Sequence, residues 1–231
     1  MIEAGPLALL IVLGGVVGLD GVSFPQAMIS RPLVSATIGG AVCGNPAAGL
    51  LVGVLLECFA LETMPFGASR YPEWGPASLV AGVVAAVPGG DPATSARLIP
   101  FAVVVGLGGA MLAGRTLIWL RRINLAVATR RRDAIAAGEA SAIVGLQRIG
   151  LAVDFLRAAA VTAVFLLVLL PVRDAVGAAS GASGALAVAV AGTLAVGVGG
   201  GAFWKVVHTT RGYAWWMAAG VIIGLAAVTL R

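Results

Sequence analysis

Long uncharged stretches dominate the pattern of the chain, and short polar segments separate them. The stretches are 4–19, 32–56, 74–90, 98–114, 158–172, 175–204 and 212–230. A helix needs about 20 apolar residues to cross the hydrocarbon core of a bilayer, and several of these stretches are shorter than that. Short or interrupted apolar segments are typical of discontinuous helices. The pattern therefore predicts an all-α polytopic membrane protein with transmembrane helices and re-entrant or broken helices.

The stretch 32–56 is interrupted in its middle by Gly44-Asn45-Pro46. Such a break is tolerated at membrane depth only where protein or a cavity surrounds the backbone. Glu57 follows the stretch directly, and an ionised side chain within a membrane indicates a functional site by default. We therefore expect a polar site beside a broken helix. The structural alternative is that Glu57 forms an ion pair with Arg31 or Arg70.

Further polar residues surround this segment. Asn45 can offer a donor and an acceptor to a hydroxylated ligand, or it can simply shape the turn. The segment 62–75, with Glu62 and Glu73 near its ends, is rich in turn-forming residues and is expected to be a loop that closes the site. Asp20 and Arg31 flank a short stretch, where they either contribute to the site or lie at the water interface.

The middle of the chain is basic. Six of the fifteen Lys and Arg residues fall between Arg115 and Arg132, directly after the predicted span 98–120. Cytoplasmic loops of membrane proteins carry an excess of positive charge, so residues 121–132 are expected to form a cytoplasmic loop. An amphipathic helix over 133–157 follows. We expect one membrane-embedded domain over 1–231, with an N-terminal region over 1–120, this basic middle region over 121–157, and C-terminal helices over 158–231.

Composition supports membrane embedding. Hydrophobic residues make up 60% of the chain and charged residues 11%, and the mean hydropathy is +1.03. Soluble domains carry about 25% charged residues. The net charge is +5, and the basic residues cluster beside apolar segments. This placement favours contact with lipid over a nucleic-acid partner. Cys43 and Cys58 lie within apolar sequence and do not suggest disulfides.

The sequence contains no metal-ligand cluster, no phosphate-binding glycine motif and no Ser/His/Asp arrangement. We therefore expect no catalytic residue, no metal and no cofactor in this chain. Pairs of small residues at helical spacing are frequent and predict close helix packing. They are Gly14/Gly18, Gly40/Gly44, Gly49/Gly53, Gly197/Gly201 and Gly220/Gly224.

The N-terminal third resembles the IIC (permease) subunit of the mannose/fructose/sorbose family of sugar phosphotransferase systems. The matching features run without gaps from Arg31 to Ser78: Arg31-Pro32-Leu33, the glycines at 40, 44, 49 and 53, Leu56-Glu57, Gly67-Ala68, Pro72-Glu73 and Ser78. Arg211-Gly212-Tyr213 resembles the C-terminal portion of the family more weakly. The family usually has Asp at the positions of Asn45 and Glu73, and often Gly at that of Glu62.

The resemblance implies a multi-pass protein of the bacterial inner membrane that carries a hexose-like sugar inward. Its implied partners are a IID membrane subunit, in an oligomer of such pairs, and IIA and IIB phosphocarrier proteins, of which IIB phosphorylates the sugar. We expect the sugar beside the broken helix, with Glu57 as the principal acceptor. A degenerate, non-transporting IIC-like protein with a sensing or assembly role remains the alternative.

Overall fold

The computed structural model describes residues 3–62, 72–86, 92–179, 183–208 and 210–229, and within these ranges every regular element is a helix. The helices are α1 (Ala4–Val22), α2 (Pro32–Val42), α3 (Pro46–Glu62), α4 (Trp74–Ala85), α5 (Pro92–Arg130), α6 (Arg132–Ala136), α7 (Ala140–Ala179), α8 (Gly184–Val207) and α9 (Tyr213–Thr229). Four of these described helices are long and apolar enough to cross a membrane. These four helices are α1, α5, α7 and α8. The all-α membrane class predicted from the sequence is confirmed.

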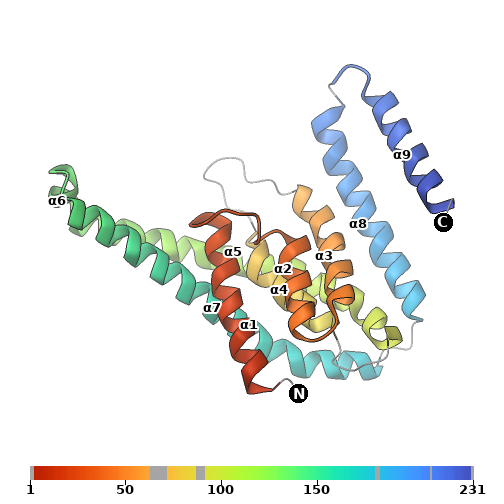
Figure 1. The fold of residues 1–231 in the computed structure, drawn as a ribbon, viewed down its shortest axis with the longest axis horizontal. Helices are drawn as coiled ribbons and strands as arrows, with labels where there is room; N and C mark the ends of the chain where they lie inside the picture. The colour runs from red at the N-terminus through yellow and green to blue at the C-terminus, as the bar shows by residue number, and fades with distance from the viewer. Residues whose placement is uncertain (1–2, 63–71, 87–91, 180–182, 209, 230–231) are drawn as a thin grey trace.

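The predicted break in the apolar stretch 32–56 is confirmed as the tip of a helical hairpin. α2 ends at Val42 and α3 begins at Pro46, and the two helices pack side by side (Figure 1). Gly44 has a φ of +79°, a left-handed conformation that glycine adopts without steric cost. Proline at the first helical position is favourable because its missing N–H would have no intrahelical partner there. Local sequence chemistry therefore explains the hairpin.

α4 forms the centre of the molecule, and each of its residues from Gly75 to Ala85 is buried. α2 packs against it so closely that small residues are required. A Cβ added to Gly39 would lie 2.1 Å from the Leu79 carbonyl oxygen, and one added to Gly82 would lie 2.0 Å from that of Ala36. Similar backbone contacts between α2 and α3 account for the predicted small residues Gly40, Gly49 and Gly53, whereas Gly14 and Gly18 of α1 make room for the Thr162 and Ala158 side chains of α7.

α5 and α7 run alongside each other and extend beyond the bundle as a long arm, with α6 at its tip (Figure 1). α5 has 39 residues, so it is about 58 Å long at 1.5 Å per residue. Residues 121–130, expected to lie in a loop, are helical, because α5 continues to Arg130; that this segment is cytoplasmic stays a prediction. The segment lacks Gly and Pro, and Arg is a good helix former, so nothing local ends the helix there.

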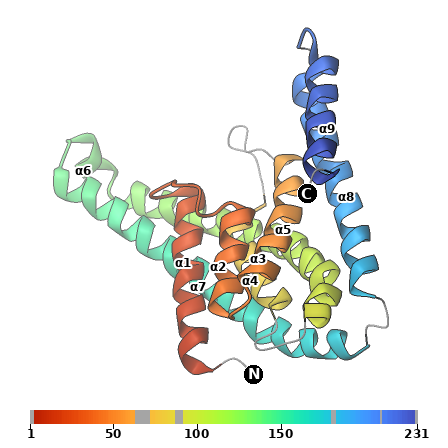
Figure 2. The same ribbon diagram turned by 45° about the vertical axis from the view of Figure 1, so that its right-hand side comes forward.

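α8 packs against α3 and α5, and α9 turns back beside it on the side of the molecule opposite the arm (Figures 1 and 2). The small-residue pairs in these two helices have no such close contacts. No atom lies within 4 Å of a Cβ added at Gly197, Gly201, Gly220 or Gly224. Close packing within the chain therefore explains the N-terminal pairs, except for Gly44 at the turn, but not the C-terminal ones.

Candidate functional site

A cavity lies at the end of the bundle where α1 and α3 finish and where α2 and α4 begin. Its volume is about 160 Å³. Apolar side chains form much of its wall, and its polar side chains are Ser30, Arg31 and Glu73. The complete lining is Val17, Gly18, Gly21, Val22, Ser30, Arg31, Pro32, Ala60, Pro72, Glu73, Trp74, Gly75 and Leu117. The cavity therefore combines an apolar surface with a few charged groups, as small-molecule sites do.

Arg31 and Glu57 form an ion pair beside the cavity. Arg31 directly precedes α2, and Glu57 projects from the facing side of α3, where its Oε1 accepts from the Arg31 Nη2. Glu57 Oε2 also accepts from the backbone N–H of Leu33 at 3.2 Å, one of the donors that the first turn of a helix leaves without an intrahelical partner. The side chains are 34% and 22% exposed, so both remain partly accessible.

Asp20 is buried within the protein, with only 2% of its surface exposed. Its carboxylate accepts from the backbone N–H of Ala27 at 2.5 Å and of Ser30 at 2.8 Å. These bonds hold the loop 23–31, in which Gln26 and Met28 have φ values of 60° and 64°. Asp20 therefore shapes the loop from which Ser30 and Arg31 reach the cavity.

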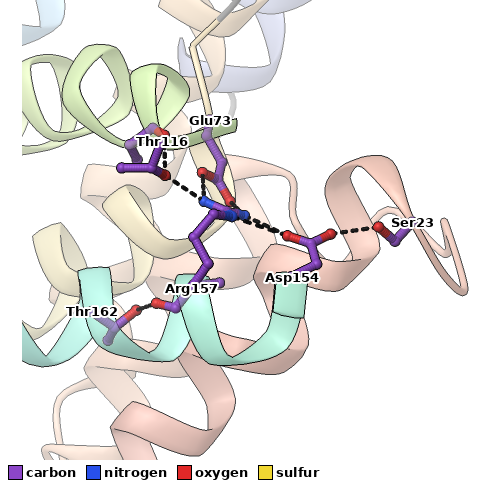
Figure 3. A network of polar contacts seen from close by, with 8 residues as sticks. Ser23, Glu73, Thr116, Asp154, Arg157 and Thr162 are labelled. Carbon is purple, nitrogen blue, oxygen red and sulfur yellow. Dashed lines mark hydrogen bonds and ion pairs between the residues drawn. The ribbon is translucent and has the colours of Figure 1, made fainter. Parts of the chain in front are cut away.

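Glu73 forms the centre of a buried network. Both of its carboxylate oxygens bind the guanidinium of Arg157 on α7, with Nη1–Oε2 at 2.6 Å and Nη2–Oε1 at 2.7 Å. Arg157 also donates to Asp154 Oδ1 at 2.7 Å and to Thr116 Oγ1 on α5 at 2.8 Å. The other oxygen of Asp154 accepts from the Ser23 hydroxyl, so the network reaches the loop after α1 (Figure 3).

Asn45 and Glu62 lie away from this cavity. Asn45 is twelve residues before Glu57, which is about 18 Å along the axis of α3. Its Oδ1 accepts from Ala48 N at 3.1 Å as a helix cap, and its Nδ2 donates to Ser95 Oγ at 3.2 Å. Glu62 binds Lys205 of α8 in an exposed ion pair.

The structure thus places Arg31 and Glu73 in the wall of one cavity. Glu57 does not line this cavity but binds Arg31 beside it, and Asp20 binds the backbone of the loop that precedes Arg31. Most of the segment 62–75 expected to close the site, and with it Arg70, lies outside the described residues. Sequence reasoning missed the roles of Asp154 and Arg157, which fall within the predicted amphipathic helix 133–157 and were not considered as site residues. A signal was available, because they are the only charged residues between 149 and 172 and directly precede an uncharged span.

No metal centre is evident in the portion of the chain that the structure describes, because it contains no group of three or more His, Cys, Asp or Glu residues placed to hold an ion. Cys43 and Cys58 are both free thiols. The chemistry available around the cavity is therefore hydrogen bonding and ion pairing by carboxylate, guanidinium and hydroxyl groups. Such groups recognise a hydroxylated ligand directionally.

Comparisons with known proteins agree with the observed fold. A family model described as the sorbose-specific IIC component of the phosphotransferase system matches residues 5–229. A solved structure titled only as a membrane protein is similar over 100% of this chain and 96% of its own, with a TM-score of 0.70 and 21% identity. The mannose transporter ManYZ, solved in complex with microcin E492 (MceA), is similar over 99% of this chain and 95% of its own, with a TM-score of 0.59 and 19% identity. No curated protein sequence matches the chain significantly.

Proposed function

The chain belongs to the family of sorbose-specific IIC components of sugar phosphotransferase systems, and we propose that it carries a hexose-like sugar inward across the bacterial inner membrane. It is therefore a membrane subunit of such a system. In this proposal a IID-type membrane subunit assembles with it, and IIA and IIB phosphocarriers supply the phosphoryl group that a IIB subunit transfers to the sugar. The chain itself binds and conducts the sugar.

The observation that carries the proposal is the cavity between α1, α2 and α4. Its volume of about 160 Å³ is an order of magnitude more than the roughly 10–15 Å³ that one water molecule needs, so a ligand of several heavy atoms fits. The cavity does not lie beside the break at 43–45, where the sequence suggested the site, but at the other end of the hairpin, where the short helices α2 and α4 begin. Short helices around a substrate site are a general feature of transporters.

Three side chains suit the recognition of a neutral polyol. Arg31 has five N–H donors, so it can bind a sugar hydroxyl while it remains in contact with Glu57. Glu57 and Glu73 accept hydrogen bonds from hydroxyl groups. In a site that is poor in water, each hydrogen bond left unmade costs about 1–3 kcal/mol, which gives a site of this kind selectivity for the arrangement of hydroxyl groups.

Asn45, Glu62 and Asp20 have supporting roles in this proposal. Asn45 caps α3 at the far end of the hairpin, and Glu62 joins α3 to α8 through Lys205. Asp20 holds the loop that carries Arg31. We propose that the sugar meets Asn45 and Glu62 only as it enters or leaves, that the buried Asp20 acts through the loop, and that Glu57 is the principal acceptor.

The test is sugar uptake in a bacterial strain that lacks its own permeases of this family. The chain is expressed with its IID, IIA and IIB partners, and labelled hexoses are offered one at a time. We expect uptake of at least one hexose, recovered as the sugar phosphate, and loss of uptake when either the chain or IIB is omitted. If all four subunits are present and no hexose enters, the alternative of a non-transporting protein is correct.

A further inference from the structure

We propose that Arg157 and Asp154 are positioning residues for sugar binding, which orient the carboxylate of Glu73 toward the cavity and link its position to that of the loop 23–31. This inference rests on the proposed function and adds to it two residues from α7. Neither residue lines the cavity, so each acts through Glu73 or through the loop.

Glu73 needs a partner to orient it, because it lies in extended backbone before α4 rather than within a helix. Its backbone N–H donates to the Ala110 carbonyl oxygen at 2.9 Å, which places its main chain against α5. The two parallel bonds from Arg157 then define the plane of the carboxylate. Each carboxylate oxygen has a second lone pair, and these remain available to a hydroxyl group in the cavity.

Asp154 and Thr116 accept hydrogen bonds from the Arg157 guanidinium and so fix its position. Asp154 Oδ1 accepts from both Nε and Nη2 of Arg157, at 3.1 and 2.7 Å, from one turn earlier on α7. Asp154 is completely buried, so its remaining oxygen also needs a donor, and the Ser23 hydroxyl supplies it. Two buried carboxylates share one guanidinium here, which makes every bond of the network difficult to replace.

The loop 23–31 and Glu73 form two walls of the same cavity. Ser30 and Arg31 come from the loop, and the left-handed conformations of Gln26 and Met28 are unusual for residues other than glycine. Such conformations persist only where the surroundings hold them, here through Asp20 and through the contact of Ser23 with Asp154. A movement of the loop therefore changes the support of Arg157, and with it the orientation of Glu73.

The first experiment measures uptake kinetics in the four-subunit system. Arg157→Lys keeps the positive charge but cannot bind both oxygens of Glu73 in parallel. We expect it to raise KM for the sugar about tenfold at unchanged membrane abundance. Arg148→Lys is the matched control, because it makes the same change at an exposed arginine of the same helix that does not line the cavity, and it should leave KM unchanged. If Arg157→Lys lowers abundance but leaves KM unaltered, the role of Arg157 is structural only and the proposal is wrong.

The second experiment tests the link to the loop by a double-mutant cycle. Ser23→Ala should raise KM severalfold in the wild-type background but have little further effect in the Arg157→Lys background. The structure gives no direct bond between Ser23 and Arg157, so non-additive effects report coupling through Asp154. Fully additive effects would contradict the proposed link.

A third measurement does not depend on transport. Spin labels at Met28 of the loop and Val164 of α7, introduced after Cys43 and Cys58 are replaced by Ala, report their separation in the purified complex. Both labelled side chains are exposed, at 71% and 56%. Arg157→Lys should broaden the distance distribution as Ser23→Ala does.

An unchanged distribution in Arg157→Lys refutes the link whether or not the wild type transports sugar. A wild-type complex that shows this coupling but transports no hexose refutes the proposed function alone.

Discussion

Replacing Glu57 by Gln separates sugar recognition from folding. The amide keeps the shape of the side chain and one acceptor oxygen, which can still receive the Leu33 N–H, but it removes the charge that attracts Arg31. The ion pair is partly exposed, at 34% and 22%, and pairs of this kind contribute at most about 1 kcal/mol to stability. The variant should therefore insert and fold normally.

The effect on sugar binding is expected to be larger. A hydrogen bond to a charged acceptor contributes about 1.5–3 kcal/mol, roughly twice as much as a bond between neutral groups. Losing the charge at Glu57 should thus cost about 1.4 kcal/mol of binding, which corresponds to a tenfold increase in KM. Uptake of labelled sugar over a range of concentrations, normalised to the amount of the chain in the membrane, measures this change.

Lys205→Gln is a suitable control, because it breaks the other ion pair of α3, at Glu62, without touching the cavity. It should leave KM and abundance unchanged. If Glu57→Gln inserts normally and takes up sugar at the wild-type rate, Glu57 is not the acceptor. If its abundance falls while KM stays constant, Glu57 is a structural partner of Arg31.

Three further predictions concern the fold and its orientation. Gly39→Ala should reduce membrane abundance severalfold, because the new Cβ would lie 2.1 Å from the Leu79 carbonyl oxygen and overpacking costs about 1–3 kcal/mol. Gly108→Ala is the control and should keep wild-type abundance, because no atom lies within 4 Å of its added Cβ. Equal abundance of the two variants on immunoblots would contradict the packing argument. Asn45→Ala should destabilise the purified protein by about 1 kcal/mol through loss of the helix cap, measured by thermal unfolding in detergent, whereas Asn45→Asp keeps the acceptor and should lose less. A cysteine at Ala137, in the exposed turn at the tip of the arm, should resist an impermeant maleimide in intact cells, because the arm is basic and predicted to be cytoplasmic; labelling from outside would reverse the topology.

Local chemistry made some of this structure predictable. Gly44 and Pro46 specify a turn and a helix start through their own backbone preferences, so the hairpin could be read from three consecutive residues. The ion pair of Glu57 with Arg31 is one of the alternatives that the sequence leaves open, because few opposite charges are available near an acid in an apolar stretch. In both cases the relevant residues lie within one helical hairpin.

Long-range pairing could not be predicted in the same way. Glu73 and Arg157 are 84 positions apart in the chain, and the sequence around each residue does not indicate which residue is its partner. The extension of α5 to Arg130 was missed for a different reason, since positive charge indicates the side of the membrane but does not end a helix. Charge is therefore a guide to orientation and a poor guide to secondary structure.

The two ion pairs at the cavity differ in how readily they can open, and this difference bears on how a sugar could be bound and released. Arg31 and Glu57 are partly exposed, so separating them costs about 1 kcal/mol or less. Glu73 and Arg157 are only 5% and 10% exposed, and breaking a buried pair costs several times more. In the proposed transport function, Arg31 and Glu57 therefore exchange partners with the hydroxyl groups of the sugar, while Glu73 stays bound to Arg157 and offers its remaining lone pairs. A site built from one labile pair and one fixed pair can select a ligand and still release it.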